Sequence, residues 1–191
     1  MKSKEQILKI RATVLYILNA FPLGIDYIKL FKILYYAQQQ HLVCYGRTII
    51  SDTFQARQKG PVCGFVRKGL KLIENSRELE DDFQLFGENI QISWGKDCQI
   101  INSAEKSDLD ELSTSEIKCL DTYIDKFRNM DSKAVSDYSH KDTAWKTAFN
   151  RAQTDPQLRV MTILEIAESG GANPNTLSYI KENLELDQAL N

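Results

Sequence analysis

The sequence predicts an α+β protein that is mostly α-helical: a compact helical domain with a small antiparallel β-hairpin or sheet. Two periodicities support this class. Apolar residues recur every three or four positions along several segments, as in amphipathic helices, whereas residues 90–100 alternate between apolar and polar side chains, as in strands. The chain has 191 residues, 42% of them hydrophobic, which suffices for a core, and we expect one domain over 1–191.

Two helices are predicted near the start of the chain. Ser3 and Gln6 form a capping-box pattern that opens a helix over about 4–20. Asp26 caps a second helix, which runs to about residue 43 and is apolar around most of its circumference, so we expect it to be central. Its narrow polar stripe is predicted to be either a solvated face or a binding face, and consists of Lys29, Lys32, Tyr36, Gln39 and Gln40.

The middle of the chain mixes strand, turn and helix signals. Residues 47–60 have strand-forming composition, and Gly60-Pro61 is predicted to end this extended segment. Proline suits the first turn of a helix, so we place a third helix over about 61–72. An acidic loop over 75–82, a β-hairpin over 90–100 and a polar linker over 103–112 follow.

Capping signals predict the remaining helices. A second capping box, Ser113 with Glu116, opens a helix over about 114–129. Thr162 caps a segment that ends near Ser169, and proline after Asn173 fits the first turn of a last helix. The other expected helices cover 131–138 and 141–150, and the helical tail covers 156–191.

The charge distribution is uneven. Residues 1–71 carry twelve Lys/Arg and three Asp/Glu, a sum of +9, whereas residues 72–191 sum to −11. Such asymmetry either marks an anionic partner for the first part or reflects two parts that pair with each other inside one domain.

Several function classes lack their usual residues. Four widely spaced cysteines without a CxxC motif are typical of reduced thiols in a cytoplasmic protein, and two distant histidines predict neither a metal site nor a cofactor. Glycine-rich phosphate loops and a nucleophile elbow are missing from the sequence. No apolar run approaches the roughly 20 residues that span a bilayer, and no cleavage site follows the basic N-terminus, so we expect no membrane contact and a cytoplasmic location.

One nucleophile–base pair deserves consideration, Cys63 with His140. Nearby cations and a helix start lower a thiol pKa, but a buried cysteine behind a turn is the simpler interpretation. His140 is interpreted either as a structural residue bonded to the backbone or, with Trp145, as a partner contact.

Three segments stand out together because of their order: KLFKILYYAQQQHLVCYGRTII (29–50), FQARQKGPVCGFVRKGLK (54–71) and SDYSHKDTAWKTAF (136–149). Together they resemble the Panacea family, the SocA-like antitoxin domain that also occurs in phage-associated proteins. The resemblance covers about residues 5–150. The matching positions are Lys29, Leu30, Lys32, Leu34, Tyr35, Tyr36, Ala37, Gln38, Ala56, Gly60, Pro61, Val62, His140 and Trp145. Arg57 and Lys59 depart from the family pattern, which usually has aromatic residues at these positions.

The resemblance implies a bacterial antitoxin that neutralises a cognate toxin by binding it, without enzymatic chemistry. A variant of this function is a proteolytic adaptor that delivers the bound toxin to a protease. On the same basis the candidate partner-binding residues are Lys29, Lys32, Tyr36, Gln40, Arg57, Lys59, Gly60, Pro61, His140 and Trp145.

Two other functions stay open at the level of sequence. The basic N-terminal part could bind nucleic acid, which requires steep salt dependence. A small cysteine-dependent enzyme would use Cys63 or His140, which requires a reactive thiol.

Overall fold

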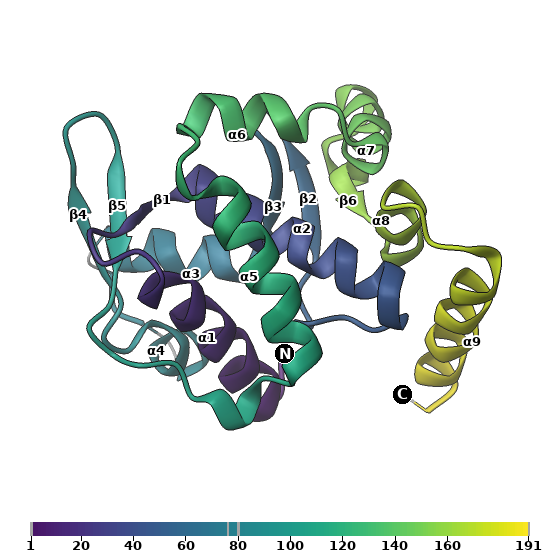
Figure 1. Cartoon of the computed structure of the whole chain (residues 1–191), viewed down its shortest axis with the longest axis horizontal. Coiled ribbons are helices and arrows are strands. Elements are labelled where there is room, and N and C mark those ends of the chain that lie inside the picture. Colours follow the sequence, from purple (N-terminus) through teal and green to yellow (C-terminus); the bar gives the residue numbers. More distant parts are fainter. Residues whose placement is uncertain (1, 76, 80, 191) are drawn as a thin grey trace.

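The computed structural model describes residues 2–75, 77–79 and 81–190 (Figure 1). It confirms a mostly helical α+β protein. The α-helices of the described residues are α1 (Lys4–Asn19), α2 (Tyr27–Tyr45), α3 (Gly64–Glu74), α4 (Asp81–Gly87), α5 (Thr114–Arg128), α6 (Ser132–Ser139), α7 (Thr143–Thr154), α8 (Ile163–Ser169) and α9 (Pro174–Leu190), with short 3-10 helices η1 (Leu109–Glu111) and η2 (Pro156–Arg159).

The strands form two small antiparallel sheets. One has the order β1-β5-β4 and the other β3-β2-β6, and the strands are β1 (Ile25–Asp26), β2 (Phe54–Arg57), β3 (Gly60–Cys63), β4 (Gln91–Trp94), β5 (Gln99–Asn102) and β6 (Val160–Met161). The pairing of β4 with β5, with Ile92 opposite Ile101, confirms the hairpin expected near residues 90–100. The pairing of β2 with β6 joins segments that lie far apart in the sequence.

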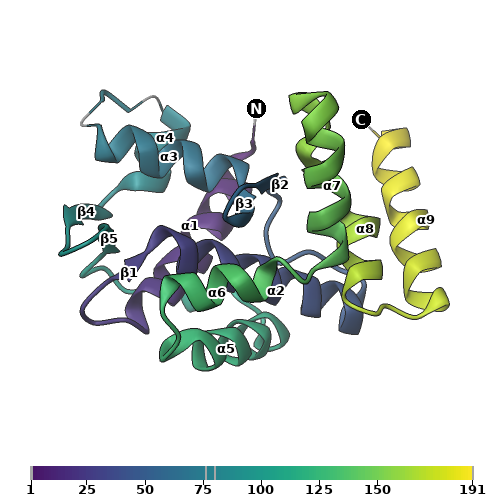
Figure 2. The same ribbon diagram turned by 90° about the horizontal axis from the view of Figure 1, so that it is seen from above.

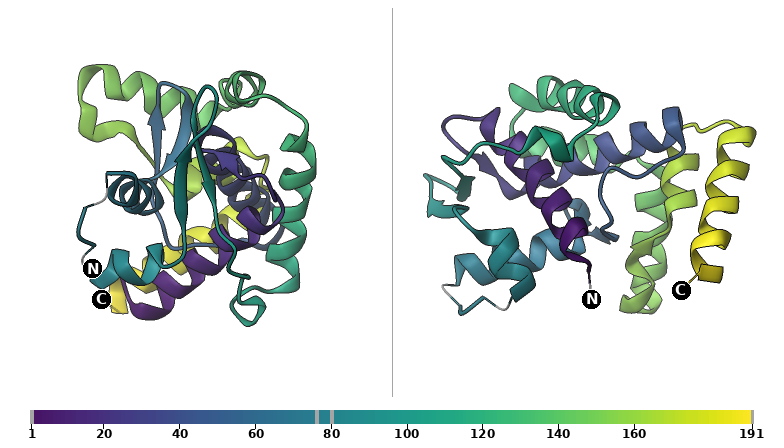
Figure 3. Two further views of the ribbon diagram at one scale, coloured as in Figure 1. Left: turned by 90° about the vertical axis from the view of Figure 1, so that its left-hand side faces the viewer. Right: turned by 90° about the horizontal axis from the view of Figure 1, so that it is seen from below.

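Helix α2 is the central element, as its apolar circumference predicts. It packs against α5 and α6 on one side and against β3 on another (Figures 1 and 2). Leu30, Ile33 and Tyr35 on this helix have no exposed surface. Helices α7, α8 and α9 gather at one end of the molecule (Figure 3), where α8 packs against α2.

Side-chain caps set most helix starts, because the first N–H groups of a helix lack partners within it. The capping boxes predicted at Ser3 and Ser113 are present, and Thr162 forms a third with Glu165. Asp26 caps α2, and Gly46, at φ +65°, ends it in the left-handed conformation that glycine adopts readily. The expected cap before Pro174 is confirmed as well, since Asn173 Oδ1 accepts a hydrogen bond from the Thr176 amide.

The prediction for Gly60-Pro61 is wrong. These residues do not begin a helix; they lie in β3, where Pro61 is opposite Ala56. Because β3 is an edge strand of its sheet, a residue without an N–H group is tolerated there. Helix α3 begins at Gly64 instead.

The first amides of α3 already have acceptors within the fold. Its Phe65 and Val66 amides both donate to the Asp52 carboxylate, at 3.0–3.2 Å, and the Gly64 amide donates to the Thr53 carbonyl at 2.8 Å. The acidic loop expected over 75–82 is also shorter than predicted. Residues 76 and 80 lie outside the described residues, and α4 begins at residue 81.

No helix within 2–75, 77–79 and 81–190 combines the length and the apolarity that crossing a membrane requires.

A buried carboxylate, Asp142, connects three helices. Its Oδ1 accepts hydrogen bonds from the Tyr35 hydroxyl (2.9 Å) and the Trp145 amide (2.8 Å), and its Oδ2 from Gln39 Nε2 (2.8 Å) and Ser169 Oγ (2.9 Å). The carboxylate therefore caps α7 while joining it to α2 and α8. A buried charge is tolerated when donors surround it in this way.

We expect Asp142→Ala to lower the free energy of unfolding by roughly 3 kcal/mol or more, because several buried donors lose their acceptor at once. Asp125→Ala is the matched control, since Asp125 is 76% exposed in an ion pair with Arg128, and such pairs contribute at most about 1 kcal/mol. Chemical denaturation of both variants measures the difference. Equal stability of the two variants would contradict the role of Asp142.

Candidate functional site

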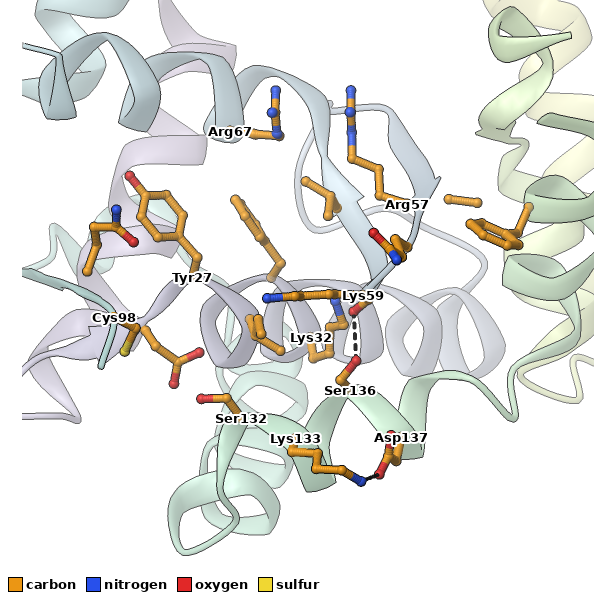
Figure 4. Close-up of a pocket in the computed structure, with 18 of the residues that line it drawn as sticks. Tyr27, Lys32, Arg57, Lys59, Arg67, Cys98, Ser132, Lys133, Ser136 and Asp137 are labelled. Atoms are coloured by element: carbon orange, nitrogen blue, oxygen red, sulfur yellow. Dashed lines mark hydrogen bonds and ion pairs between the residues drawn. The ribbon is translucent and has the colours of Figure 1, made fainter. Parts of the chain in front are cut away.

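An open cleft of about 970 Å³ lies against α2 (Figure 4). Its other walls come from α3, the β2–β3 hairpin, α6, α7 and the segment 97–99. Apolar side chains such as Phe31, Val62 and Phe149 contribute to these walls, and basic side chains from several elements surround them.

The β2–β3 hairpin that borders this cleft is held through its backbone. Three successive carbonyl groups at its turn accept hydrogen bonds from side chains of the α6–α7 segment. The pairs are Trp145 Nε1 to the Arg57 carbonyl (3.0 Å), His140 Nε2 to the Gln58 carbonyl (3.1 Å) and Ser136 Oγ to the Lys59 carbonyl (3.3 Å). We call this set, together with Lys32 described below, the hairpin brace.

Lys32 completes the hairpin brace from α2. Its Nζ donates to the Pro61 carbonyl at 3.2 Å, and the residue is only 1% exposed. Gly60 lies directly against it at φ +99°, and a Cβ at this position would collide with Lys32 and with Ser139. Only glycine therefore fits between β3 and the two helices.

The aromatic rings of the α6–α7 segment stack in a row. His140 lies on Trp145 with 4.4 Å between ring centroids, and Trp145 lies on Phe149 at 4.9 Å, with interplanar angles of 19° and 20°. Together with the hydrogen bond from His140 Nε2 to the Gln58 carbonyl, this confirms that His140 bonds to the backbone. A direct contact of His140 or Trp145 with a partner stays a prediction.

The polar stripe expected on α2 is not an exposed face. Lys32, Tyr36 and Gln39 are 1%, 4% and 6% exposed, while Lys29 and Gln40 are half-buried. Each buried member serves the fold: Lys32 holds the hairpin, Gln39 binds Asp142, and the Tyr36 ring packs among other aromatic rings. These neighbours are Tyr35, Tyr123, Phe127 and Tyr138.

Gln38, in the same segment 29–50, also has a structural role. Its Oε1 accepts hydrogen bonds from the Ile49 and Ile50 amides, at 2.8 and 3.1 Å, so it fixes the loop that leads from α2 to β2.

The structure does not bring the proposed nucleophile–base pair together. Cys63 is fully buried, and burial raises the pKa of its thiol well above the usual value, which disfavours the nucleophilic thiolate. Both residues are described, and no hydrogen bond joins Cys63 to His140. Among the residues of known placement, no group of three His, Cys, Asp or Glu side chains could hold a metal ion.

Part of the charge asymmetry is resolved within the fold. Lys9 Nζ lies 2.6 Å from the Glu116 carboxylate, and Arg11 lies 2.6 Å from Glu105 and 3.8 Å from Glu88. The basic N-terminal part and the acidic later part therefore do face each other along α1.

Other basic residues line the cleft without an acidic partner in the described ranges. Arg57, Lys59, Arg67 and Arg159 line it, and none of them forms an ion pair with an acidic group in the described ranges. Burial is the main cause that lowers the pKa of Arg57, and the positive charges of Arg67 and Arg159, which line the same cleft, lower it further. The side chains of Arg57 and Arg67 extend in the same direction from β2 and α3 (Figure 4).

Sequence reasoning found Arg57 and Lys59 but missed Arg67 and Arg159. The position of Arg67 four residues before Lys71 places both on one side of α3, which was a usable signal. No local pattern relates Arg159 to Arg57, because the pairing of β2 with β6 is what brings their segments together.

In a comparison with family models, residues 30–146 match the antitoxin SocA-like Panacea domain. The match spans more than half of the chain, and the chain therefore belongs to this family. It includes the β2–β3 hairpin and the four residues whose side chains form the hairpin brace, Lys32, Ser136, His140 and Trp145. Searches of curated proteins and of solved structures returned no match.

Lys32 predicts a distinctive pH dependence of stability. Burial lowers its pKa from 10.5 to about 7, while the nearby Cys63 and Asp26 raise it and Lys59 lowers it. Between pH 7 and 10.5 the unfolded chain binds this proton more than the folded chain does, so stability rises with pH in this window.

We therefore expect the free energy of unfolding of the wild type to rise relative to that of Lys32→Met, by up to about 1.4 kcal/mol per pH unit above pH 7. Urea titrations across this window measure both proteins, and Lys146→Met controls for the loss of one surface lysine. Parallel pH profiles of wild type and Lys32→Met would contradict a charged Lys32 that is destabilised by burial.

Proposed function

We propose that this chain is an antitoxin that binds and neutralises a cognate toxin of a bacterial toxin–antitoxin system. Its membership of the antitoxin SocA-like Panacea family carries this proposal. The family implies a toxin partner in general terms, and the cleft beside the hairpin brace is the surface that we propose for contact with it.

Two features of the cleft favour it as the contact surface. First, its hairpin is fixed by four side chain–backbone hydrogen bonds, so little conformational freedom is lost when a partner binds. Second, the half-buried Arg57 and the exposed Lys59 line this cleft, and neither forms an ion pair with an acidic group in the part of the chain that the structure describes.

The toxin would be neutralised by occlusion of its active surface, and we favour this over proteolytic delivery because a preformed cleft suits stable binding. The two modes differ in the fate of the toxin. Occlusion leaves the toxin half-life in cells unchanged or longer, whereas an adaptor shortens it.

A nucleic-acid-binding function is the second candidate, because the structure gathers Arg57, Arg67 and Arg159 on one surface. Three aspartates, Asp26, Asp97 and Asp137, line the same cleft, so its lining is not uniformly positive, as a surface that follows a phosphate backbone is expected to be. This observation places the nucleic-acid function after toxin binding.

Co-expression with the product of the adjacent open reading frame tests the proposed function. We expect the neighbour alone to arrest growth, the wild-type chain to relieve the arrest, and the two proteins to purify as a complex. Arg57→Glu with Lys59→Glu is expected to abolish relief, because charge reversal turns attraction into repulsion. The matched control, Lys68→Glu with Lys146→Glu, changes two exposed lysines outside the cleft, and we expect this variant still to relieve the growth arrest.

A harmless neighbour that forms no complex would contradict the antitoxin function. Full relief of growth arrest by the Arg57→Glu, Lys59→Glu chain would instead contradict the proposed contact surface.

A further inference from the structure

We propose that the cleft binds an acidic polypeptide segment, with carboxylates at the arginine cluster of Arg57, Arg67 and Arg159 and an apolar side chain against the neighbouring wall. This inference rests on the proposed function, and it names the chemistry of the partner surface.

The charge of the cleft is the first argument. Seven of its lining residues are Lys or Arg and three are Asp. Several of these charges are already satisfied: Lys133 pairs with Asp137 at 2.6 Å, Lys71 with Glu74 at 2.6 Å, and Asp26 caps α2. Apart from Lys32, which binds the Pro61 carbonyl, and Asp97, what is left is the arginine cluster with Lys59, and none of these four forms an ion pair within the described parts of the chain.

The hydrogen-bonding state of Arg57 is the second argument. One terminal nitrogen of Arg57 donates to Gln55 Oε1 at 2.9 Å, while the Arg57 Nε is buried and has no hydrogen-bond acceptor among the described residues. An unmet donor of this kind in a folded protein calls for a ligand acceptor or another specific explanation. A carboxylate that bonds a guanidinium through two parallel N–H groups supplies such an acceptor.

The mutual position of the arginines is the third argument. All three line the same cleft, where their like charges repel one another, and a bound anion relieves this repulsion. The elements that carry them are fixed by contacts elsewhere: the hairpin by its brace, α3 by Asp52, and η2 by its connection to β6. The fold therefore keeps the three positive charges in the same cleft, and an anionic ligand that binds there is stabilised by all three.

The walls of the cleft favour a polypeptide over a nucleic acid. Half-buried Phe149 and Ala152 lie on the α7 side, and Asp97 lies on the opposite side near β5. A peptide places carboxylates and apolar side chains at separate points, so it can satisfy the arginines and cover the apolar wall together. A phosphate backbone carries charge at every unit, so it does not separate its charges from apolar groups in this way.

Fluorescence anisotropy with a defined probe tests this inference without the toxin. The probe is a short fluorescein-labelled peptide of glutamate residues around one central leucine. The comparison probes are the same peptide with glutamine in place of glutamate, and a labelled single-stranded DNA with an equal number of negative charges. The wild-type chain is expected to bind the glutamate peptide more tightly than either of the other two.

Two double variants locate the binding. Arg57→Gln with Arg67→Gln is expected to weaken peptide binding by roughly ten-fold or more, because charge-assisted hydrogen bonds are lost. Arg67→Gln with Arg159→Gln gives the same result while leaving β2 unaltered. Lys68→Gln with Lys146→Gln removes the same charge outside the cleft and is expected to leave affinity within about two-fold of the wild type.

Absence of glutamate-peptide binding, tighter binding of the DNA, or equal losses in the cleft and control variants would each overturn the inference. Its failure is distinguishable from failure of the proposed function, because growth relief by co-expression does not depend on this peptide. Relief without peptide binding would keep the antitoxin function and reject the acidic segment.

Discussion

The structure depends on the attachment of one short hairpin to α2, which precedes it, and to the α6–α7 segment, which comes much later in the chain. The hydrogen bonds of the hairpin brace go to the backbone of the hairpin and not to its side chains. Their acceptors are the carbonyl groups that bind Trp145, His140, Ser136 and Lys32. Backbone acceptors constrain shape without constraining most side chains. The side chains at Arg57 and Lys59 are therefore free to differ, while their positions beside the cleft are fixed.

This separation gives the family motifs a physical meaning. Most of the residues that resemble the family pattern form the frame, by which we mean the contacts that fix the hairpin and the helices around it. Lys32 binds the hairpin, Tyr35 binds the Asp142 carboxylate, and Gln38 binds the loop before β2. Arg57 and Lys59, where the chain departs from that pattern, face the cleft instead. We interpret the frame as common to the family and the cleft side chains as the part adapted to a particular partner.

The sequence predicts local features of this fold well, because caps and periodicity act over a few residues. Ser3, Asp26, Ser113 and Thr162 start their helices as expected. Gly60-Pro61 was misplaced because proline suits both a first helical turn and an edge strand, and only the pairing with β2 decides between them. Contacts between distant segments also limit how far the candidate site can be predicted. The side chains of the polar stripe on α2 are buried by other elements of the fold, and the pairing of β2 with β6 is what brings Arg159 to the cleft.

The central claim is that the segment 136–149, with Ser136, His140 and Trp145, acts by bracing the hairpin, and amide hydrogen exchange of Trp145→Phe tests it most directly. This variant keeps a ring for stacking on His140 but removes the N–H group that binds the Arg57 carbonyl. The account predicts that amides in Phe54–Cys63 exchange roughly five-fold faster, as loss of a hydrogen bond of about 1 kcal/mol requires, while those in α1 and α5 keep their rates. Unchanged exchange in the hairpin, together with weaker partner binding, would show that Trp145 acts by direct contact and would contradict the account.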